Sequence, residues 1–131
     1  MPSVDINWWA VLAATLINMI LGSVWYMPRV FGDAWKKATK ADMKGGNTAY
    51  AITAIAALVQ SYILVHFVRY AGSTTFWKGA MTGFWLWLAF VAVVMLTTVL
   101  FEGRSWMVWR INAGYWLVLL LINGGLLAAW R

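Results

Sequence analysis

The sequence is poor in the residues on which most protein chemistry depends. It has no cysteine, one histidine and four acidic residues among its 131 residues. Without cysteine there are no disulfides, no thiolate metal ligands and no cysteine nucleophile. The acids lie at the ends of apolar stretches or between them, and they are Asp5, Asp33, Asp42 and Glu102. Because no paired carboxylates, buried proton relay or glycine-rich phosphate loop can be found, we expect neither enzymatic activity nor a bound cofactor.

Apolar residues, by contrast, are abundant. They make up 63% of the chain and give it a mean hydropathy of +0.73. They form four long stretches, at residues 6–26, 47–67, 79–101 and 111–130. A helix needs about 20 apolar residues to span about 30 Å of hydrocarbon, and the stretches lack the alternation of transmembrane β-strands. The sequence therefore predicts one all-α domain over residues 1–131, a four-helix transmembrane bundle.

The basic residues are distributed unevenly between the two sides of this predicted bundle. One side has seven, in or beside the two segments that join the first stretch to the second and the third to the fourth: Arg29, Lys36, Lys37, Lys40, Lys44, Arg104 and Arg110. The other side has three: Arg69, Lys78 and Arg131. The positive-inside rule predicts that the richer side is cytoplasmic, with both termini outside. The net charge of +6 follows from these segments and does not indicate nucleic-acid binding.

The segment after the first stretch has a pattern of its own. Pro28 ends the first helix, because a proline disfavours helical geometry in the residue before it. Apolar residues then recur at helical spacing: Phe31, Ala34, Trp35 and Ala38. They predict a short amphipathic helix in the cytoplasmic interface, with its apolar side toward lipid. Its lysines, from Lys36 to Lys44, would contact anionic headgroups. A simple ordered connector and a partner-docking helix are the alternatives for this segment.

Each apolar stretch carries small and polar residues on one face. They are Asn18 and Gly22, Gln60 and Ser61, Gly79, Gly83 and Thr97, and Asn112 and Asn123. Helices in lipid associate through small residues and interhelical hydrogen bonds, so these stripes predict packing faces or the lining of a polar path. From their depth, Gln60 and Asn123 are predicted to form an amide–amide pair. Asn18 is expected to bond to Thr97, Thr98 or water.

The eleven tryptophans are mostly placed near the ends of the stretches. Indole has an apolar body and one N–H donor, so this placement predicts aromatic belts at the two membrane interfaces. Trp85 and Trp87 lie deeper in the third stretch. We expect them to face lipid, with an internal contact as the alternative.

Three functions are compatible with these patterns. The leading hypothesis is a structural or accessory protein that oligomerises or serves as a subunit of a larger membrane assembly, because the spans carry packing motifs and no charged groups. The second is a small-molecule channel or carrier lined by Asn18, Gln60 and Asn123. The third is a haem- or pigment-binding subunit that uses the imidazole of His66 as a ligand.

Two blocks of the sequence have a recognisable spacing. The first contains Asn7-Trp8, Gly22-Ser23-Val24-Trp25-Tyr26-Met27-Pro28, Phe31-Gly32 and Ala34-Trp35. The second contains Phe101-Glu102-Gly103-Arg104 and Ile111-Asn112-Ala113-Gly114-Tyr115. Together they resemble a family of small bacterial membrane proteins, domain of unknown function 1761. The resemblance covers the whole chain and implies a four-helix protein of unassigned activity in the bacterial inner membrane.

Both blocks are predicted to lie at the cytoplasmic ends of the helices. The first would form the turn into the interfacial helix, with Trp25, Tyr26, Pro28, Phe31, Gly32 and Trp35. In the second, Glu102 is expected to pair with Arg29 or Arg104 and to tie the two cytoplasmic segments together. Glu102→Gln is then expected to lower the stability of the bundle.

Overall fold

The computed structural model describes residues 2–40 and 45–131, which are helical apart from an extended start and short connections. The elements are α1 (Trp8–Trp25), η1 (Pro28–Gly32), α2 (Asp33–Thr39), α3 (Gly46–Tyr70), α4 (Phe76–Trp87), η2 (Leu88–Ala92), α5 (Val93–Glu102) and α6 (Trp106–Ala129), where η marks a π-helical turn. Four helices are long and apolar enough to span a membrane: α1, α3, α6, and the continuous helix made by α4, η2 and α5. The predicted all-α class is confirmed.

Side-chain caps explain where two of these helices begin. The Ser105 hydroxyl accepts a hydrogen bond from the backbone N–H of Met107 at 3.1 Å, and α6 therefore begins at Trp106 rather than at the predicted residue 111. Asn7 caps α1 in the same way. Such caps satisfy N–H groups that have no partner within the helix, so they can extend a helix into a polar segment that hydropathy alone leaves out.

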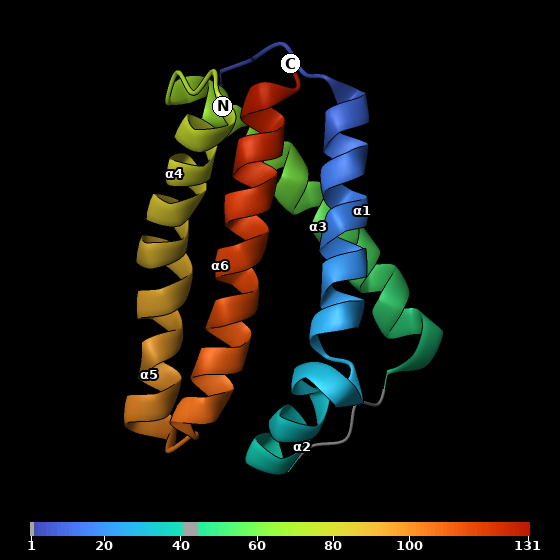
Figure 1. The fold of residues 1–131 in the computed structure, drawn as a ribbon, viewed down its shortest axis with the longest axis vertical. Helices are drawn as coiled ribbons and strands as arrows, with labels where there is room; N and C mark the ends of the chain where they lie inside the picture. The colour runs from blue at the N-terminus through green and yellow to red at the C-terminus, as the bar shows by residue number, and fades with distance from the viewer. Residues whose placement is uncertain (1, 41–44) are drawn as a thin grey trace.

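The spanning helices run up and down, and both chain termini lie at the same end of the bundle (Figure 1), which we call the terminal end. At the opposite end, the α2 end, η1 and α2 lie beneath the bundle. α6 contacts α1, α3, α4 and α5 and is the most buried of the spanning helices. α3 diverges from α1 toward the α2 end.

α4 and α6 are in backbone contact because glycines lie between them. A Cβ atom on Gly79 would lie 2.1 Å from the carbonyl oxygen of Gly124, and one on Gly83 would lie 2.1 Å from that of Leu120. Any side chain at these positions would force the two backbones apart. The two glycines of the G-x-x-x-G spacing therefore lie on the face that packs against α6.

Thr97 does not lie on that face, although the sequence predicted that it would. It follows Gly79 by eighteen residues, which is five turns of a regular helix at about 3.6 residues per turn. The π-helical turn η2 inserts about one extra residue and rotates the rest of the helix by about 100°. Thr97 is exposed, and its hydroxyl donates to the carbonyl oxygen of Val94 at 2.9 Å.

Burial is concentrated toward the terminal end. Val11, Val65, Val68 and Leu127 are at most 1% exposed and belong to one core cluster. The first part of α3, residues 46–56, is much less buried. Only Ala54 is half-buried there and the other residues are exposed. α3 thus packs within the bundle along its second half alone.

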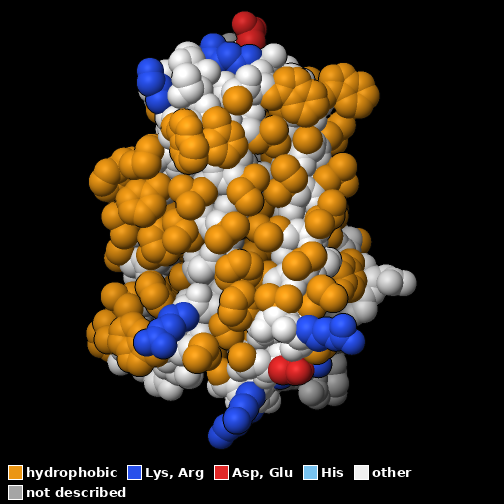
Figure 2. Space-filling model, in the orientation of Figure 1, with side chains coloured by type: hydrophobic (Ala, Val, Ile, Leu, Met, Phe, Trp, Pro, Cys, Tyr) orange, Lys and Arg blue, Asp and Glu red, His pale blue; other side chains and the backbone are white. Residues whose placement is uncertain are grey.

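The outer surface between the two ends is apolar. Figure 2 shows hydrophobic side chains over this whole middle band, with lysine, arginine and acidic side chains confined toward the two ends. A patch of this extent marks a membrane or protein contact rather than a water-exposed surface. The distribution fits a chain whose helices cross a bilayer.

η1 and α2 fold back against the protein, so that part of their apolar side packs on the bundle while Phe31 and Ala34 stay exposed. The ring of Phe31 lies 4.7 Å from that of Trp25, and Trp35 is half-buried with its ring edge-on to Tyr26 at 6.0 Å. The described lysines of this segment are exposed: Lys36, Lys37 and Lys40. The predicted lysine at position 44 lies outside the described residues.

Candidate functional site

The two motif blocks meet at the α2 end, although 86 residues separate their bonded members. The indole N–H of Trp25 donates to the carbonyl oxygen of Ile111 at 2.9 Å. The hydroxyl of Tyr26 donates to Asn112 Oδ1 at 2.7 Å. These bonds join the end of α1 to the first turns of α6. We call this contact between Trp25, Tyr26, Ile111 and Asn112 the motif junction.

Glycines allow aromatic rings to close around the motif junction. The ring of Tyr115 lies 6.3 Å from that of Trp25 and 5.8 Å from that of Tyr26. A Cβ atom on Gly22 would lie 3.2 Å from the Tyr115 hydroxyl oxygen, and one on Gly114 would lie 3.3 Å from the Trp25 ring. Gly22 and Gly114, one from each motif block, thus face aromatic side chains of the opposite block.

Gly32 has a different role, in the turn that follows α1. Its N–H donates to the carbonyl oxygen of Met27 at 2.8 Å, which closes the π-helical turn that begins at Pro28. A Cβ atom on Gly32 would lie 2.2 Å from the carbonyl oxygen of Tyr26. Because this contact is with backbone, no larger residue fits without opening the turn. Gly32 therefore sets the path by which α2 returns to the bundle.

A buried polar cluster continues from the junction toward the middle of the bundle. Asn18 Nδ2 donates to Gln60 Oε1 at 3.1 Å. The hydroxyl of Tyr115 lies 2.7 Å from Asn18 Oδ1 and 2.9 Å from the Asn18 carbonyl oxygen. Three helices, α1, α3 and α6, are linked through these side chains. Asn18, Gln60 and Tyr115 form what we call the amide cluster.

The expected pair of Gln60 and Asn123 is not formed. Gln60 bonds to Asn18 instead, and Asn123 Nδ2 donates to the carbonyl oxygen of Ala14 at 3.1 Å. Asn18 likewise takes Gln60 and Tyr115 as partners rather than the expected threonines or water. The sequence indicates the depth of each amide in the membrane. It does not give the angle at which α3 crosses α1, and that angle decides which amide Gln60 meets.

Two buried oxygens near this cluster have no hydrogen-bond partner among the described residues. They are Ser61 Oγ and Asn123 Oδ1. Both side chains are 1% exposed and lie on faces that point into the bundle. The positions chosen from the polar stripes are buried or half-buried, apart from the exposed Thr97. They divide into separate contacts and do not line one continuous path.

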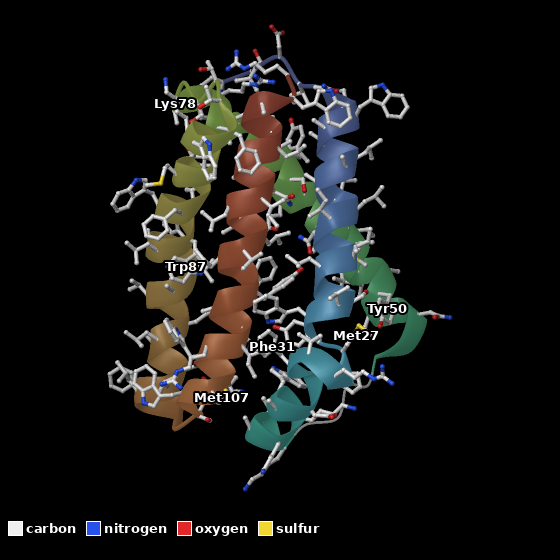
Figure 3. All side chains as sticks on the ribbon, viewed as in Figure 1. Met27, Phe31, Tyr50, Lys78, Trp87 and Met107 are labelled. Carbon is white, nitrogen blue, oxygen red and sulfur yellow. The ribbon has the colours of Figure 1, made fainter. Side chains whose placement is uncertain are left out.

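A pocket of about 320 Å³ lies beside the motif junction, between α1, α3 and α6. Its wall is largely apolar and aromatic, and it is formed by Asn18, Met19, Gly22, Ser23, Tyr26, Gly45, Gly46, Ala49, Tyr50, Thr53, Tyr115 and Trp116. Figure 3 shows Tyr50 on the part of α3 that diverges from α1. The volume is near the lower limit for a small-molecule site.

The pocket has a lining of uncharged side chains among the described residues. Its lining, within the part of the chain that the structure describes, contains no carboxylate, amine, guanidinium or imidazole. Burial, and secondarily Tyr115, raise the pKa of Tyr26 to about 12, so this phenol stays neutral at physiological pH. The hydroxyls of Ser23 and Thr53 donate to backbone carbonyls of their own helices. The polar groups of this aromatic wall include hydroxyl oxygens that can still accept, and donors on the Tyr50 phenol and the Trp116 indole.

His66 is buried at the other end of α3 and is 3% exposed. Its Nδ1 lies 2.7 Å from the carbonyl oxygen of Tyr62. Because a carbonyl only accepts, Nδ1 carries the proton and Nε2 keeps its lone pair. The rings of Tyr62 and Tyr70 lie 4.6 and 6.0 Å away. The described residues contain no group of three or more His, Cys, Asp or Glu side chains that could hold a metal ion.

Glu102 pairs with Arg104, one of its two expected partners. The Nε atom of Arg104 lies 3.3 Å from Glu102 Oε2, and both side chains are more than half exposed. The pair spans two residues of the same turn, so it does not tie the two segments of the α2 end together. A surface pair of this kind contributes about 0–1 kcal/mol, and the expected destabilisation by Glu102→Gln is revised to a small effect.

Two tryptophans make contacts that sequence reasoning missed. The indole of Trp87 donates to the carbonyl oxygen of Ala113 at 2.8 Å, and that of Trp109 donates to Ala92 at 3.1 Å. Trp87 was expected to face lipid, as Trp85 does with 61% exposure. Ala92 ends the π-helical turn η2, where the regular hydrogen-bond pattern is interrupted. Because that turn has no sequence signature, these partners could not be found from the chain alone.

Apolar helices of spanning length, connected by short turns around buried amides, define a multi-pass membrane protein. The chain matches the model of the family described as "Protein of unknown function (DUF1761)" over residues 9–128, and it belongs to that family. The resemblance carried by the two motif blocks is thereby confirmed. No curated protein and no solved structure matches the chain.

Proposed function

We propose that this protein is a small accessory subunit of the bacterial inner membrane, without enzymatic activity, that works by assembling with its own copies or with another membrane protein. The proposal is supported by the first part of α3. Of residues 46–56, only Ala54 is half-buried and the others are exposed. A helix that leaves its bundle for this length has most of its circumference available to a neighbouring helix.

The residues of this part of α3 suit helix association in lipid. Ala49 and Thr53 lie four residues apart, one turn from each other, and both line the pocket beside α1. Gly22 lines the same pocket from α1. Small residues let helix backbones approach closely, which is the main source of affinity between helices in a bilayer. A helix of a second chain is therefore the occupant that this surface favours.

The proposed assembly has a defined orientation. The excess of lysine and arginine at the α2 end favours the cytoplasmic side for η1 and α2, and the outer side for both termini. Lys36, Lys37 and Lys40 are exposed there, where they would contact anionic lipid headgroups. Residues 46–56 of α3, through which the assembly is proposed, would then begin at the cytoplasmic interface and end near the middle of the membrane.

Native mass spectrometry of the gently extracted protein tests this proposal. We expect a mass above the 14.8 kDa of one chain, either a whole number of chains or one chain with a second protein. A single chain as the sole species, both in mild detergent and in nanodiscs cut directly from the membrane, would contradict the proposal.

A small-molecule carrier is the second candidate, and the pocket of about 320 Å³ favours it. Asn18 lines this pocket and Gln60 lies directly behind it, bonded to Asn18. Asn123 bonds to Ala14 and is not part of the lining. A carrier of this kind would take an uncharged solute, because the pocket offers neutral polar groups and apolar surface and no charged side chain among its lining residues.

Two leucine substitutions on α3 separate this candidate from the first. Ala49→Leu fills the pocket, whereas Ala51→Leu adds the same volume on an exposed position outside it. Stopped-flow measurements on proteoliposomes with glycerol and urea would show whether the protein conducts these solutes. A carrier loses its flux with Ala49→Leu and keeps it with Ala51→Leu. Equal flux in both variants, or none in the wild type, would remove this candidate.

A further inference from the structure

A second cavity lies at the terminal end, far from the motif junction. It has a volume of about 890 Å³ and is lined by residues 3–7, Arg69 and Arg131. The hydroxyl of Tyr70 donates to the carbonyl oxygen of Pro2, which holds the extended start of the chain over the end of α3. The cavity is therefore enclosed on one side by residues 3–7 and on the other by two arginines.

Arg69 is the unusual residue of this cavity. It is half-buried in the last turn of α3, and its Nε atom is shielded from solvent without a hydrogen-bond partner among the described residues. Asp5 lines the same cavity, but it forms no ion pair within 4.0 Å with either arginine in the part of the chain that the structure describes. A shielded guanidinium nitrogen without an acceptor is costly, and no side chain of the described residues compensates this arginine at close range.

Arg131 supplies a second guanidinium in the same cavity. Its Nη2 atom donates to the carbonyl oxygen of Ser73 at 3.3 Å, which anchors the side chain from one edge. Two positive charges therefore face one carboxylate, that of Asp5, across the cavity. Arginine presents its donors in a planar fork that matches the oxygens of an oxyanion.

We propose that this cavity, the terminal-end cavity, binds a phosphate group between Arg69 and Arg131. Arg69 lies where α3 ends, at the level of the lipid phosphates if α3 spans the membrane. A phosphate has enough oxygens to accept from both guanidinium groups at once. The phosphate belongs either to a lipid headgroup or to a soluble anion, and the chemistry of recognition is the same. The inference does not depend on the proposed assembly through α3.

Thermal unfolding of the whole protein in a nonionic detergent tests the inference. One arm compares sodium phosphate with sodium chloride at matched ionic strength. The other compares dioleoylphosphatidylglycerol with dioleoylglycerol, which has the same chains and no phosphate. At ten times the dissociation constant, we expect the melting temperature to rise by about 5 °C.

Three substitutions show whether the rise comes from this cavity. Arg69→Gln and Arg131→Gln should abolish it, whereas Lys78→Gln removes a charge from an exposed position at the same end and should preserve it. Figure 3 shows Lys78 at the terminal end. If Arg69→Gln fails to fold, the result for Arg131→Gln shows whether the rise in melting temperature comes from this cavity, because Arg131 is exposed and outside the core.

The phosphate and lipid comparisons distinguish the two sources of the phosphate group. A rise with phosphatidylglycerol alone supports a lipid headgroup as the occupant, and a rise with inorganic phosphate alone supports a soluble anion. No rise from either source, or an equal rise in Lys78→Gln, Arg69→Gln and Arg131→Gln, overturns the proposal.

Discussion

At the scale of single residues, Asn18 links α1 to both α3 and α6 through buried polar contacts. Its side chain donates to Gln60 and accepts from Tyr115, and its carbonyl oxygen also lies within hydrogen-bond distance of the Tyr115 hydroxyl. Asn18 is 4% exposed, so water does not readily replace a lost partner. Asn18 therefore contributes to the contacts of α1 with both α3 and α6.

Replacement of Asn18 by leucine should lower the free energy of unfolding by about 1–3 kcal/mol, because Gln60 and Tyr115 would lose a buried partner. Chemical unfolding in detergent measures this change. Asn18→Leu combined with Gln60→Leu should cost less than the sum of the single substitutions, since the double variant leaves fewer unpaired groups. Strictly additive costs would show that the two amides do not interact.

Trp87 and Trp85 form a matched pair on one helix. The indole N–H of Trp87 donates to Ala113, whereas Trp85 is largely exposed. We expect Trp87→Phe to lower the free energy of unfolding by about 1 kcal/mol more than Trp85→Phe, because only the former removes an interhelical hydrogen bond. Thermal unfolding of both variants in the same detergent checks this. Equal losses would mean that the bond adds no net stability.

At the scale of helices, apolar length predicted the four spans but not their internal irregularities. The π-helical turn η2 rotates α5 away from the glycine face of α4, and Thr97 consequently lies outside that face. Periodicity assumes a regular helix, so any position beyond such a turn is assigned to the wrong side. Gly79 and Gly83 precede η2, which is why their shared face could be recognised from their spacing.

Gly83 and Gly114 test how closely the helices must approach. A Cβ atom on Gly83 would meet the backbone of α6, whereas one on Gly114 would meet the ring of Trp25 at 3.3 Å. Gly83→Ala should therefore destabilise the protein by about 1–3 kcal/mol through overpacking. In Gly114→Ala the helix propensity of alanine offsets the contact, so the change should stay below about 1 kcal/mol.

Thermal unfolding of the two alanine variants measures this difference. If both variants unfolded at the wild-type temperature, the close contact between α4 and α6 would not exist in the membrane protein as it is extracted.

At the scale of the whole molecule, the two ends of the bundle are built differently. The terminal end has the core cluster, with Val65, Val68 and Leu127 fully buried. The α2 end has the motif junction, a pocket and the diverging half of α3. Composition and apolar length predicted the number of spans, and the resemblance to the family marked the motif residues. They could not predict this asymmetry, because it depends on helix crossing angles that no local pattern encodes.

The assembly proposed through α3 is the central claim, and site-specific photocrosslinking in native membranes tests it most directly. The chain has no cysteine, so Ala51→Cys on α3 and Val94→Cys on α5 each give one attachment site for benzophenone maleimide. Both positions are exposed. The account predicts a protein crosslink from residue 51, to a second copy or to another protein, and none from residue 94. Equal crosslinking from both positions, or none from residue 51, would contradict it.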